Sequence, residues 1–402
     1  MKLSNDNKNI KLNKNYDNLT NNYLFVTIKN KVNEFKNKNK DIDIINLGIG
    51  DVTLPIVKSI SKKMSRISLD MSVKEKFKGY LDEQGIIPLR ESVKRYYYEN
   101  YNINLKLSDI FISDGACSDL ANILDIFENN IDVLIPNPVY PAYVDSNIMK
   151  GNNIIYCFGS KENNFLPMPD YNVKCDLIYL CSPNNPTGST YNHKELEEWV
   201  NYAMYNKAII IFDSAYQIFI KDNSLPKSIY EIKNSKKCCI EICSFSKTAG
   251  FTGLRCGYTI VPLEIENELV NKMWLRRQST KFNGASYLVQ EGAIEIFNKE
   301  TFKEINKNID YYLENARLLK ECLNKLKIWN IGGENSPYIW IECKKGMNSW
   351  EYFDYLLNKC SIVCTPGIGF GENSDGYVRF SCFCSREDIF KVIDKLNKIT
   401  IK

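Results

Sequence analysis

The chain has 402 residues, of which 44% are hydrophobic and 25% charged, which is the composition of an ordinary soluble globular protein with room for two domains. The formal net charge is +4, and 52 basic residues, spread along the chain, almost balance 48 acidic ones. This balance excludes a basic stripe for nucleic acid, so we expect no nucleic acid among the partners.

The N-terminal segment, residues 1–22, is rich in Asn and Lys and has no apolar run of the kind that a secretory signal needs. It also has too little Arg and Ser for a transit peptide. We therefore expect a mobile tail over residues 1–22 and a cytoplasmic protein. The longest apolar runs, such as residues 208–212, are far too short to cross a membrane, so no membrane partner is expected.

Short β-rich runs alternate with helical stretches through the first 260 residues, a pattern typical of βαβ units around a mostly parallel sheet. We predict strands at 110–113, 132–136, 153–158, 176–181, 208–213, 240–245 and 256–261, with helices that include 117–127 and 196–204. After residue 284 helical patterns dominate up to 326. Strands at 338–342, 362–365 and 377–382 and helices at 349–357 and 386–396 then predict a smaller α+β region. The predicted domains are an N-terminal arm that completes the small domain (23–58), a large domain (59–290) and a small C-terminal domain (291–402).

The fourteen cysteines are scattered through apolar runs, without the paired spacing of zinc ligands. Because a buried free cysteine behaves as a small hydrophobe, we interpret them as packing residues and predict neither disulfides nor a metal site. The single histidine, His193, lies among charged residues on a predicted helix, which argues against catalysis by histidine.

The segment Ser244-Phe-Ser-Lys247 follows an alternating run that predicts a strand, so it lies on the turn at the end of that strand. The groups in and after this segment suit a ligand that carries a phosphate and, near it, a carbon that a nitrogen can attack. They are the hydroxyls of Ser244 and Ser246, the amine of Lys247 and the guanidinium of Arg255. A lysine forms a Schiff base with an aldehyde, and pyridoxal phosphate (PLP) carries an aldehyde and a phosphate on one ring. The alternative is a plain surface loop, where Ser and Lys are common.

Two upstream segments supply what such a ring still needs. Asp213 ends a continuous apolar run that predicts a buried parallel strand, and ligands of open α/β sheets bind at that edge. Its carboxylate can pair with a protonated pyridine nitrogen, and Tyr216 can reach the phenolic oxygen of the ring; the alternative for Asp213 is a helix N-cap. Asn185 lies in the rigid turn Ser182-Pro-Asn-Asn-Pro-Thr-Gly188, and its amide can donate to the same oxygen.

Two further candidates lie on either side of these segments. Ser113-Asp-Gly115 predicts a strand-to-helix turn, where the amides of Ala116 and Cys117 can hold a phosphate; the alternative is a tight turn without a ligand. Arg379 lies in a predicted strand, where an inward arginine needs a partner. That partner is either the α-carboxylate of a substrate, bound through two hydrogen bonds, or a carboxylate of the protein in a structural salt bridge.

Asn185-Pro-Thr-Gly188, Asp213-x-x-Tyr216, Ser244-x-Ser-Lys247 and Arg255, in this order, resemble the fold-type I PLP-dependent aminotransferases. Longer strings narrow the resemblance to the LL-diaminopimelate aminotransferases, over nearly the whole chain from about Tyr23 onward. These strings are Leu47-Gly-Ile-Gly-Asp51, Phe77-Lys-Gly-Tyr80, Glu83-Gln-Gly85, Ser113-Asp-Gly115, Pro138-Val-Tyr-Pro-Ala-Tyr-Val-Asp145, Phe212-Asp-Ser-Ala-Tyr216, Ala249-Gly-Phe-Thr-Gly253 and Phe282-Asn-Gly-Ala-Ser286. The resemblance implies PLP as cofactor and an α/β fold with a large, mostly parallel-sheet domain and a smaller α+β domain.

The resemblance also implies roles that the residues alone do not show. Tyr140, between two prolines, would stack on the cofactor ring, and Tyr80 would donate to its phosphate. Glu83 would face the distal ammonium of a diamino acid. The residues that shape the substrate site would be Tyr23, Gly50, Glu83, Tyr140, Asn185, Asn283 and Arg379. Some of them would reach in from a second subunit, so a homodimer with shared active sites is implied.

The implied reaction is transamination between amino acids and 2-oxo acids. Lys247 would hold PLP and, once displaced by the substrate amine, move the proton between the substrate Cα and C4′ of the cofactor. Glutamate or LL-2,6-diaminopimelate would be the donor, with 2-oxoglutarate and tetrahydrodipicolinate as keto partners, in lysine and cell-wall precursor synthesis. One position departs from the family: Cys117 stands where the family has a lysine, and this loss of charge bears on substrate preference. The alternatives are a transaminase for aromatic or aspartate-like amino acids, a PLP β-lyase, and a PLP-binding regulatory protein without activity.

Overall fold

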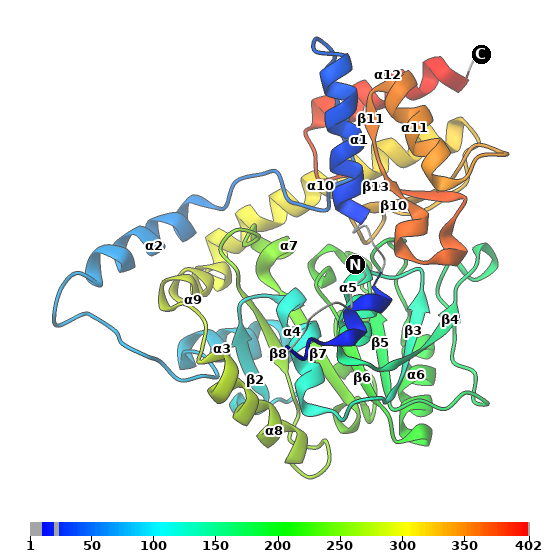
Figure 1. The fold of residues 1–402 in the computed structure, drawn as a ribbon. Coiled ribbons are helices and arrows are strands. Elements are labelled where there is room, and N and C mark those ends of the chain that lie inside the picture. Colours follow the sequence, from blue (N-terminus) through cyan, green and yellow to red (C-terminus); the bar gives the residue numbers. More distant parts are fainter. Residues whose placement is uncertain (1–9, 20–23, 401–402) are drawn as a thin grey trace.

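A seven-stranded sheet forms the centre of the computed structural model, which describes residues 10–19 and 24–400 (Figure 1). Its strand order is β2-β8-β7-β6-β5-β3-β4. The strands are β2 (Ile110–Ser113), β3 (Asp132–Asn137), β4 (Asn153–Phe158), β5 (Leu177–Cys181), β6 (Ile209–Asp213), β7 (Cys239–Ser244) and β8 (Gly257–Ile260). Within this sheet only β8 runs antiparallel to its neighbours, so the predicted mostly parallel sheet is confirmed.

Helices cover both faces of this sheet, because most of its strands bury side chains on both sides. The helices of this region are α2 (Lys58–Asp70), α3 (Ile87–Val93), α4 (Ala116–Asn122), α5 (Pro141–Lys150), α6 (His193–Asn206), α7 (Phe245–Ala249), α8 (Leu269–Arg277) and α9 (Tyr287–Ile294). Leu120, Tyr143 and Trp274 bring α4, α5 and α8 into one apolar cluster. Trp199 of α6 and Val289 of α9 belong to a second cluster, on the opposite face.

A smaller region with its own core lies above the large sheet in Figure 1. Its elements are α1 (Leu24–Lys38), β1 (Ile45–Asn46), α10 (Lys299–Lys325), β9 (Asn330–Gly332), β10 (Tyr338–Glu342), α11 (Ser349–Cys360), β11 (Ile362–Val363), β12 (Thr365–Pro366), β13 (Tyr377–Ser381) and α12 (Arg386–Thr400). Four of the strands form an antiparallel sheet in the order β12-β13-β10-β9, while β1 pairs with β11 in parallel. The N-terminal arm and the C-terminal part of the chain therefore share this region.

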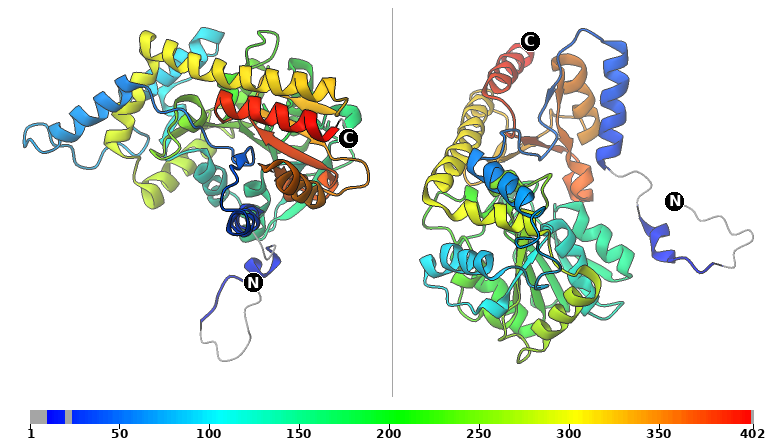
Figure 2. Two further views of the ribbon diagram at one scale, coloured as in Figure 1. Left: turned by 90° about the horizontal axis from the view of Figure 1, so that it is seen from above. Right: turned by 90° about the vertical axis from the view of Figure 1, so that its left-hand side faces the viewer.

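The long helix α10 belongs to both cores and crosses from one to the other (Figure 2). Ile309 and Tyr312 in its first half pack in the core of the large sheet, whereas Leu319 and Leu323 in its second half pack in the smaller core. The domain limits at 58/59 and 290/291 stay predictions, because one continuous helix serves both regions.

Part of the segment predicted as a tail has structure. Lys14–Asn18 forms a 3-10 helix beside α5, and the side-chain amides of Asn13 and Asn15 donate to the Met149 carbonyl at 2.9 and 3.3 Å. The rest of the predicted tail, residues 1–9 and 20–22, lies outside the described residues.

Twelve of the fourteen cysteines are buried, which fits their interpretation as small apolar packing residues, while Cys117 is exposed. Over residues 10–19 and 24–400, no helix has both the length and the apolar character that a membrane crossing needs. The same ranges hold no cluster of His, Cys, Asp or Glu side chains arranged to bind a metal ion.

One ionisable side chain of β7 is buried in the core without a cationic partner among the described residues. The carboxyl group of Glu241 accepts hydrogen bonds from the Tyr98 hydroxyl at 2.8 Å and the Ser228 hydroxyl at 2.9 Å. Burial disfavours the charged form and raises the pKa of Glu241 to about 7, although these hydrogen bonds oppose the shift. Its ionisation therefore works against folding.

This burial predicts a pH-dependent stability. Below a pH of about 4.5, its pKa in the unfolded chain, the carboxyl group is neutral in both states and its ionisation costs no stability. Stability is lost as the pH rises through about 7, by up to about 3 kcal/mol. Glu241→Gln removes the charge and keeps an oxygen acceptor. Melting temperatures between pH 5 and 8 should therefore fall less steeply in Glu241→Gln than in the wild type. Glu91→Gln, on the exposed side of α3, should keep the wild-type slope; equal slopes in all three proteins would contradict the prediction.

Candidate active site

A cavity of about 420 Å³ opens at the carboxyl ends of β5, β6 and β7, where the large sheet meets β10 and β13 of the smaller region. This is the edge at which open α/β sheets bind ligands. Twelve of the residues predicted from the sequence line it: Gly50, Ala116, Cys117, Tyr140, Asn185, Asp213, Tyr216, Ser244, Ser246, Lys247, Arg255 and Arg379. The structure thus brings together side chains that are far apart in the sequence.

Lys247 lies just beyond the end of β7, as predicted, but in the short helix α7 instead of a turn. The Ser244 hydroxyl caps this helix by accepting from the Ser246 amide at 3.1 Å. The Lys247 side chain is half-buried in the wall of the cavity, and its Nζ donates to the Gly50 carbonyl. An amine held in this way is not the surface lysine of the alternative interpretation.

The pKa of Lys247 is lowered to about 8, chiefly because burial disfavours the ammonium form. The positive charges of Arg379 and Arg255 lower this pKa further, while the carboxylate of Asp51 opposes the shift. A substantial fraction of the amine is therefore neutral near physiological pH, as a nucleophile or a base requires.

Asp213 ends β6 and is buried with two hydrogen-bond donors, but with no cation among the described residues. The Tyr143 hydroxyl donates to one carboxylate oxygen at 2.5 Å and the Ala215 amide to the other at 2.9 Å. Burial raises the pKa of Asp213, and these two hydrogen bonds oppose the rise. The N-cap alternative is wrong, because the chain turns after Asp213 and then forms only the 3-10 helix Gln217–Phe219.

Arg379 is 2% exposed and holds Asn185 in one orientation. Its Nη1 donates to Asn185 Oδ1 at 2.6 Å and its Nη2 to the Gly48 carbonyl at 2.9 Å. Because the oxygen of Asn185 is occupied, its NH₂ group remains to donate to a ligand. Among the described residues no carboxylate pairs with Arg379 and its buried Nε has no acceptor, so the salt-bridge alternative finds no partner there.

The other end of the cavity carries groups suited to an anion. Ser244, Ser246 and Arg255 line it, together with the first residues of α4. Gly115 precedes that helix with φ +119°, and a Cβ at this position would lie 2.6 Å from Arg255 Nη2. Glycine is therefore needed for the close approach of the turn to the guanidinium. Cys117 is exposed at this end, its sulfur 3.8 Å from the Tyr140 hydroxyl.

These groups fit pyridoxal phosphate. Hydroxyls and a guanidinium stand at one end for a phosphate, and the amine of Lys247 is available for an aldehyde. The buried carboxylate of Asp213 lacks a cation, which a protonated pyridine nitrogen supplies. Asn185 and Tyr216 offer donors for a phenolic oxygen.

Two tyrosines of the cavity are not predicted from the sequence. Tyr143 follows Tyr140 by three residues at the start of α5, and this repeat after one helical turn is the only signal that could have pointed to it. Tyr338, the first residue of β10, has its hydroxyl 2.7 Å from that of Tyr216, 122 residues away along the chain. No local pattern indicates that contact.

Three of the predicted site residues, Tyr80, Glu83 and Asn283, do not line this cavity, and Tyr23 lies outside the described residues. Tyr80 is 92% exposed on the segment that follows α2, which projects from the body of the molecule (Figure 1). Glu83 is next to Gly284, since a Cβ at that glycine would come within 3.8 Å of the Glu83 Cα. Glu83 and Asn283 thus lie on adjacent segments, away from their own chain's cavity.

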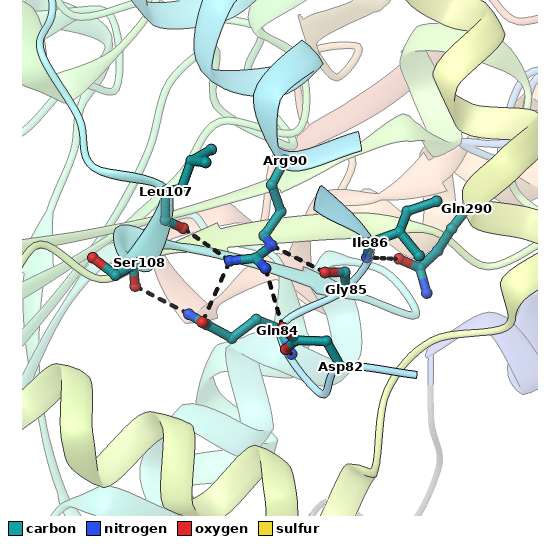
Figure 3. Close-up of polar contacts among 8 residues, drawn as sticks. All are labelled: Asp82, Gln84, Gly85, Ile86, Arg90, Leu107, Ser108 and Gln290. Carbon is teal, nitrogen blue, oxygen red and sulfur yellow. Dashed lines mark hydrogen bonds and ion pairs between the residues drawn. The ribbon is translucent and has the colours of Figure 1, made fainter. Parts of the chain in front are cut away.

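The segment with Glu83 is held firmly by Arg90 of α3 (Figure 3). The Arg90 side chain donates to the Gly85 carbonyl at 3.0 Å, to the Asp82 carboxylate at 3.2 Å and to the Leu107 carbonyl at 3.3 Å. Gly85 has φ +94°, and a Cβ there would clash with Ile112. Glu83 is therefore presented on an ordered turn.

Comparisons with known proteins agree with the geometry of the site. The family model of aminotransferase class I and II matches residues 42–396. Proteins named LL-diaminopimelate aminotransferase from Parabacteroides distasonis and Phocaeicola vulgatus are 42% and 43% identical, each over 96% of this chain and 98% of the relative. The solved structure of L,L-diaminopimelate aminotransferase from Chlamydomonas reinhardtii is 38% identical and covers 98% of this chain and 99% of its own, with a TM-score of 0.92.

More distant structures show the fold alone. A Thermus thermophilus aspartate aminotransferase variant is 17% identical and covers 97% of this chain and 100% of its own, with a TM-score of 0.86. The family match spans both cores and every residue of the cavity described above. The chain belongs to the class I and II aminotransferases and is a PLP-dependent transaminase of fold type I.

Proposed function

We propose that this aminotransferase acts on LL-2,6-diaminopimelate, in the synthesis of lysine and peptidoglycan precursors. Glutamate, tetrahydrodipicolinate and the water that opens its ring would give 2-oxoglutarate and LL-diaminopimelate. The observation that carries the proposal is the 42–43% identity to proteins of that name over 96% of the chain. The cavity supports it with a half-buried lysine, a buried aspartate and a buried arginine at the positions that transamination uses.

Bound PLP supplies the sink for the electron pair that the substrate α-carbon releases when it loses its proton. Lys247 Nζ takes that proton and moves it, which its lowered pKa of about 8 allows near neutral pH. Asp213 keeps the proton on the ring nitrogen, and the Tyr143 hydroxyl holds its carboxylate in place. Asn185 and Tyr216 donate to the phenolic oxygen of the ring.

Arg379 binds the α-carboxylate of the substrate. Its buried Nε–H has no acceptor in the described part of the chain, so a carboxylate satisfies a donor that is otherwise left unpaired. Ser244, Ser246, Arg255 and the start of α4 (Ala116 and Cys117) hold the phosphate, and Tyr140 stacks on the ring. Gly50 also lines the cavity, and its carbonyl accepts a hydrogen bond from Lys247 Nζ.

The active form in this proposal is a homodimer in the cytoplasm. Tyr80, Glu83 and Asn283 lie outside their own cavity, so they serve the site of the second copy, as Tyr23 would. Phe77, beside Tyr80 on the projecting segment, is 60% exposed, and a second copy would cover this apolar surface. The Arg90 contacts keep Glu83 ordered for this purpose.

The first test concerns the lysine. Lys247→Ala should fold but show neither the visible absorbance of PLP bound through a lysine nor any turnover, because no other amine among the described residues lines the cavity. Lys345→Ala, an exposed lysine of the smaller region, should behave as the wild type. Near-normal activity of Lys247→Ala would contradict its assignment.

A second test concerns the substrate. Only the diamino acid offers a distal ammonium to Glu83, and removing one partner of a desolvated charge pair costs roughly 2–5 kcal/mol. Glu83→Gln should therefore lower kcat/KM for diaminopimelate by roughly 30-fold or more, with little change for glutamate. Glu75→Gln, on the same projecting segment, is the matched control. Equal losses with both substrates would make Glu83 structural, and a wild-type preference for an aromatic or aspartate-like donor, or β-elimination, would replace the proposed substrate.

A third test concerns the shared site. Lys247→Ala and Glu83→Gln chains, each inactive or weak with diaminopimelate, should regain activity when they are unfolded and refolded together. A mixed dimer then has one site with both residues intact and one with neither. If Glu83 instead served its own chain's site, every site of the mixed dimer would carry one defect, and no activity would return.

A further inference from the structure

Two tyrosine hydroxyls meet in the wall of the cavity, one from each core. Tyr216 follows β6 of the large sheet, Tyr338 begins β10 of the smaller region, and their hydroxyl oxygens are 2.7 Å apart. Both side chains are buried, and the rings pack edge to face with centroids 5.2 Å apart. A Cβ on Gly50 would overlap the Tyr338 hydroxyl, so this hydroxyl is confined between the glycine and Tyr216.

The direction of this hydrogen bond has a chemical consequence. Each hydroxyl has one proton, so Tyr216 can donate either to Tyr338 or to the phenolic oxygen of the cofactor, but not fully to both. In the described part of the chain, the Tyr338 hydroxyl has no other hydrogen-bond partner than Tyr216. If Tyr216 donates to the cofactor, the 2.7 Å contact between the two hydroxyl oxygens is a hydrogen bond only when Tyr338 donates to Tyr216.

We propose that Tyr338 is a positioning residue that donates to Tyr216 and so directs the Tyr216 proton to the phenolic oxygen of the cofactor. The inference rests on the proposed place of the cofactor ring beside Tyr216. With this role the smaller region contributes a second residue to the chemistry, besides Arg379. That residue is Tyr338 of β10, whose hydroxyl donates the first of the two hydrogen bonds.

The charges around the pair favour this direction. The guanidinium of Arg379, from β13, lies over the Tyr338 ring, 4.4 Å from its centroid. A cation on the ring face makes the hydroxyl of that ring a better donor. Burial raises the pKa of both tyrosines and Arg379 opposes both rises, so the position of the guanidinium over the Tyr338 ring is what favours Tyr338 as the donor. The other titratable groups that act on the pair are Cys181 of β5 and Asp51, and both act on the pKa in the sense opposite to Arg379.

An accepted hydrogen bond polarises the Tyr216 O–H and strengthens its donation to the ring oxygen. That donation stabilises the anionic phenolic oxygen. It thereby lowers the pKa of the nitrogen that joins Lys247 to the cofactor. Loss of the Tyr338 hydroxyl should raise this pKa, which is measured directly by titrating the visible absorbance of the purified enzyme with bound PLP.

The test compares Tyr338→Phe with three other proteins. The phenylalanine keeps the ring packing on Tyr216 and Phe383 and removes only the hydroxyl. We expect its absorbance titration to shift upward by roughly 0.4–1 pH unit. Tyr216→Phe should shift it further, and adding Tyr338→Phe to that variant should cause no additional shift. Tyr191→Phe also removes a buried hydroxyl, one bonded to the Pro167 carbonyl at 2.9 Å away from this site, and should leave the titration unchanged.

Three results would overturn the inference. A wild-type titration in Tyr338→Phe, alongside a shifted one in Tyr216→Phe, would show that Tyr338 does not direct the proton. An equal shift from Tyr338→Phe in the presence and absence of the Tyr216 hydroxyl would show that it acts on the cofactor by another route. An unchanged titration in Tyr216→Phe would place the ring away from Tyr216 and remove the basis of the inference, while leaving the substrate proposal to the Glu83 test.

Discussion

The hydrogen bond from Arg379 to Asn185 joins the two cores of this chain in the wall of the candidate active site. Arg379 comes from the small antiparallel sheet and Asn185 from the turn after β5 of the large one, and the bond is 2.6 Å long. The same guanidinium lies over Tyr338. In the proposed site, one buried cation therefore orients both residues that donate to the phenolic oxygen of the cofactor, Asn185 by a hydrogen bond and Tyr216 through Tyr338.

Burial of the Arg379 guanidinium costs free energy, and contacts with neighbouring protein groups offset part of this cost. The Gly48 carbonyl and Asn185 accept two of its hydrogen bonds, and the rings of Tyr338 and Phe370 lie against its faces. Its Nη2 also donates to the Thr365 hydroxyl at 3.3 Å, whereas Nε has no acceptor among the described residues and in the proposed site is left for the substrate. A site that leaves one buried donor unpaired until the carboxylate arrives gains more from binding that carboxylate than a fully satisfied arginine would.

The sequence predicted the parts of the fold and site that follow from local patterns. Each predicted strand of the large sheet ends within one residue of the observed one, because apolar runs mark most of these strands. Asp213 was predicted because it ends a continuous apolar run, and Lys247 because its segment follows an alternating one. The contacts of Tyr143 with Asp213 and of Tyr338 with Tyr216 were not, since they join residues 70 and 122 positions apart. Such contacts depend on how elements pack, which local periodicity does not encode.

The two arginines that we propose as anion-binding residues also contribute to the lowered pKa of Lys247. Arg255 and Arg379 both lower its pKa, in addition to burial. In the proposed site the phosphate stays with the protein and offsets the charge of Arg255 throughout, whereas the charge of Arg379 would be offset only when a substrate carboxylate is bound. Binding of the substrate therefore raises the proton affinity of Lys247 at the moment when the amine must take a proton from the α-carbon. A lysine at position 117 would add a third cation near Lys247; with cysteine there, Arg255 and Arg379 are the cations that lower this pKa, against the carboxylate of Asp51.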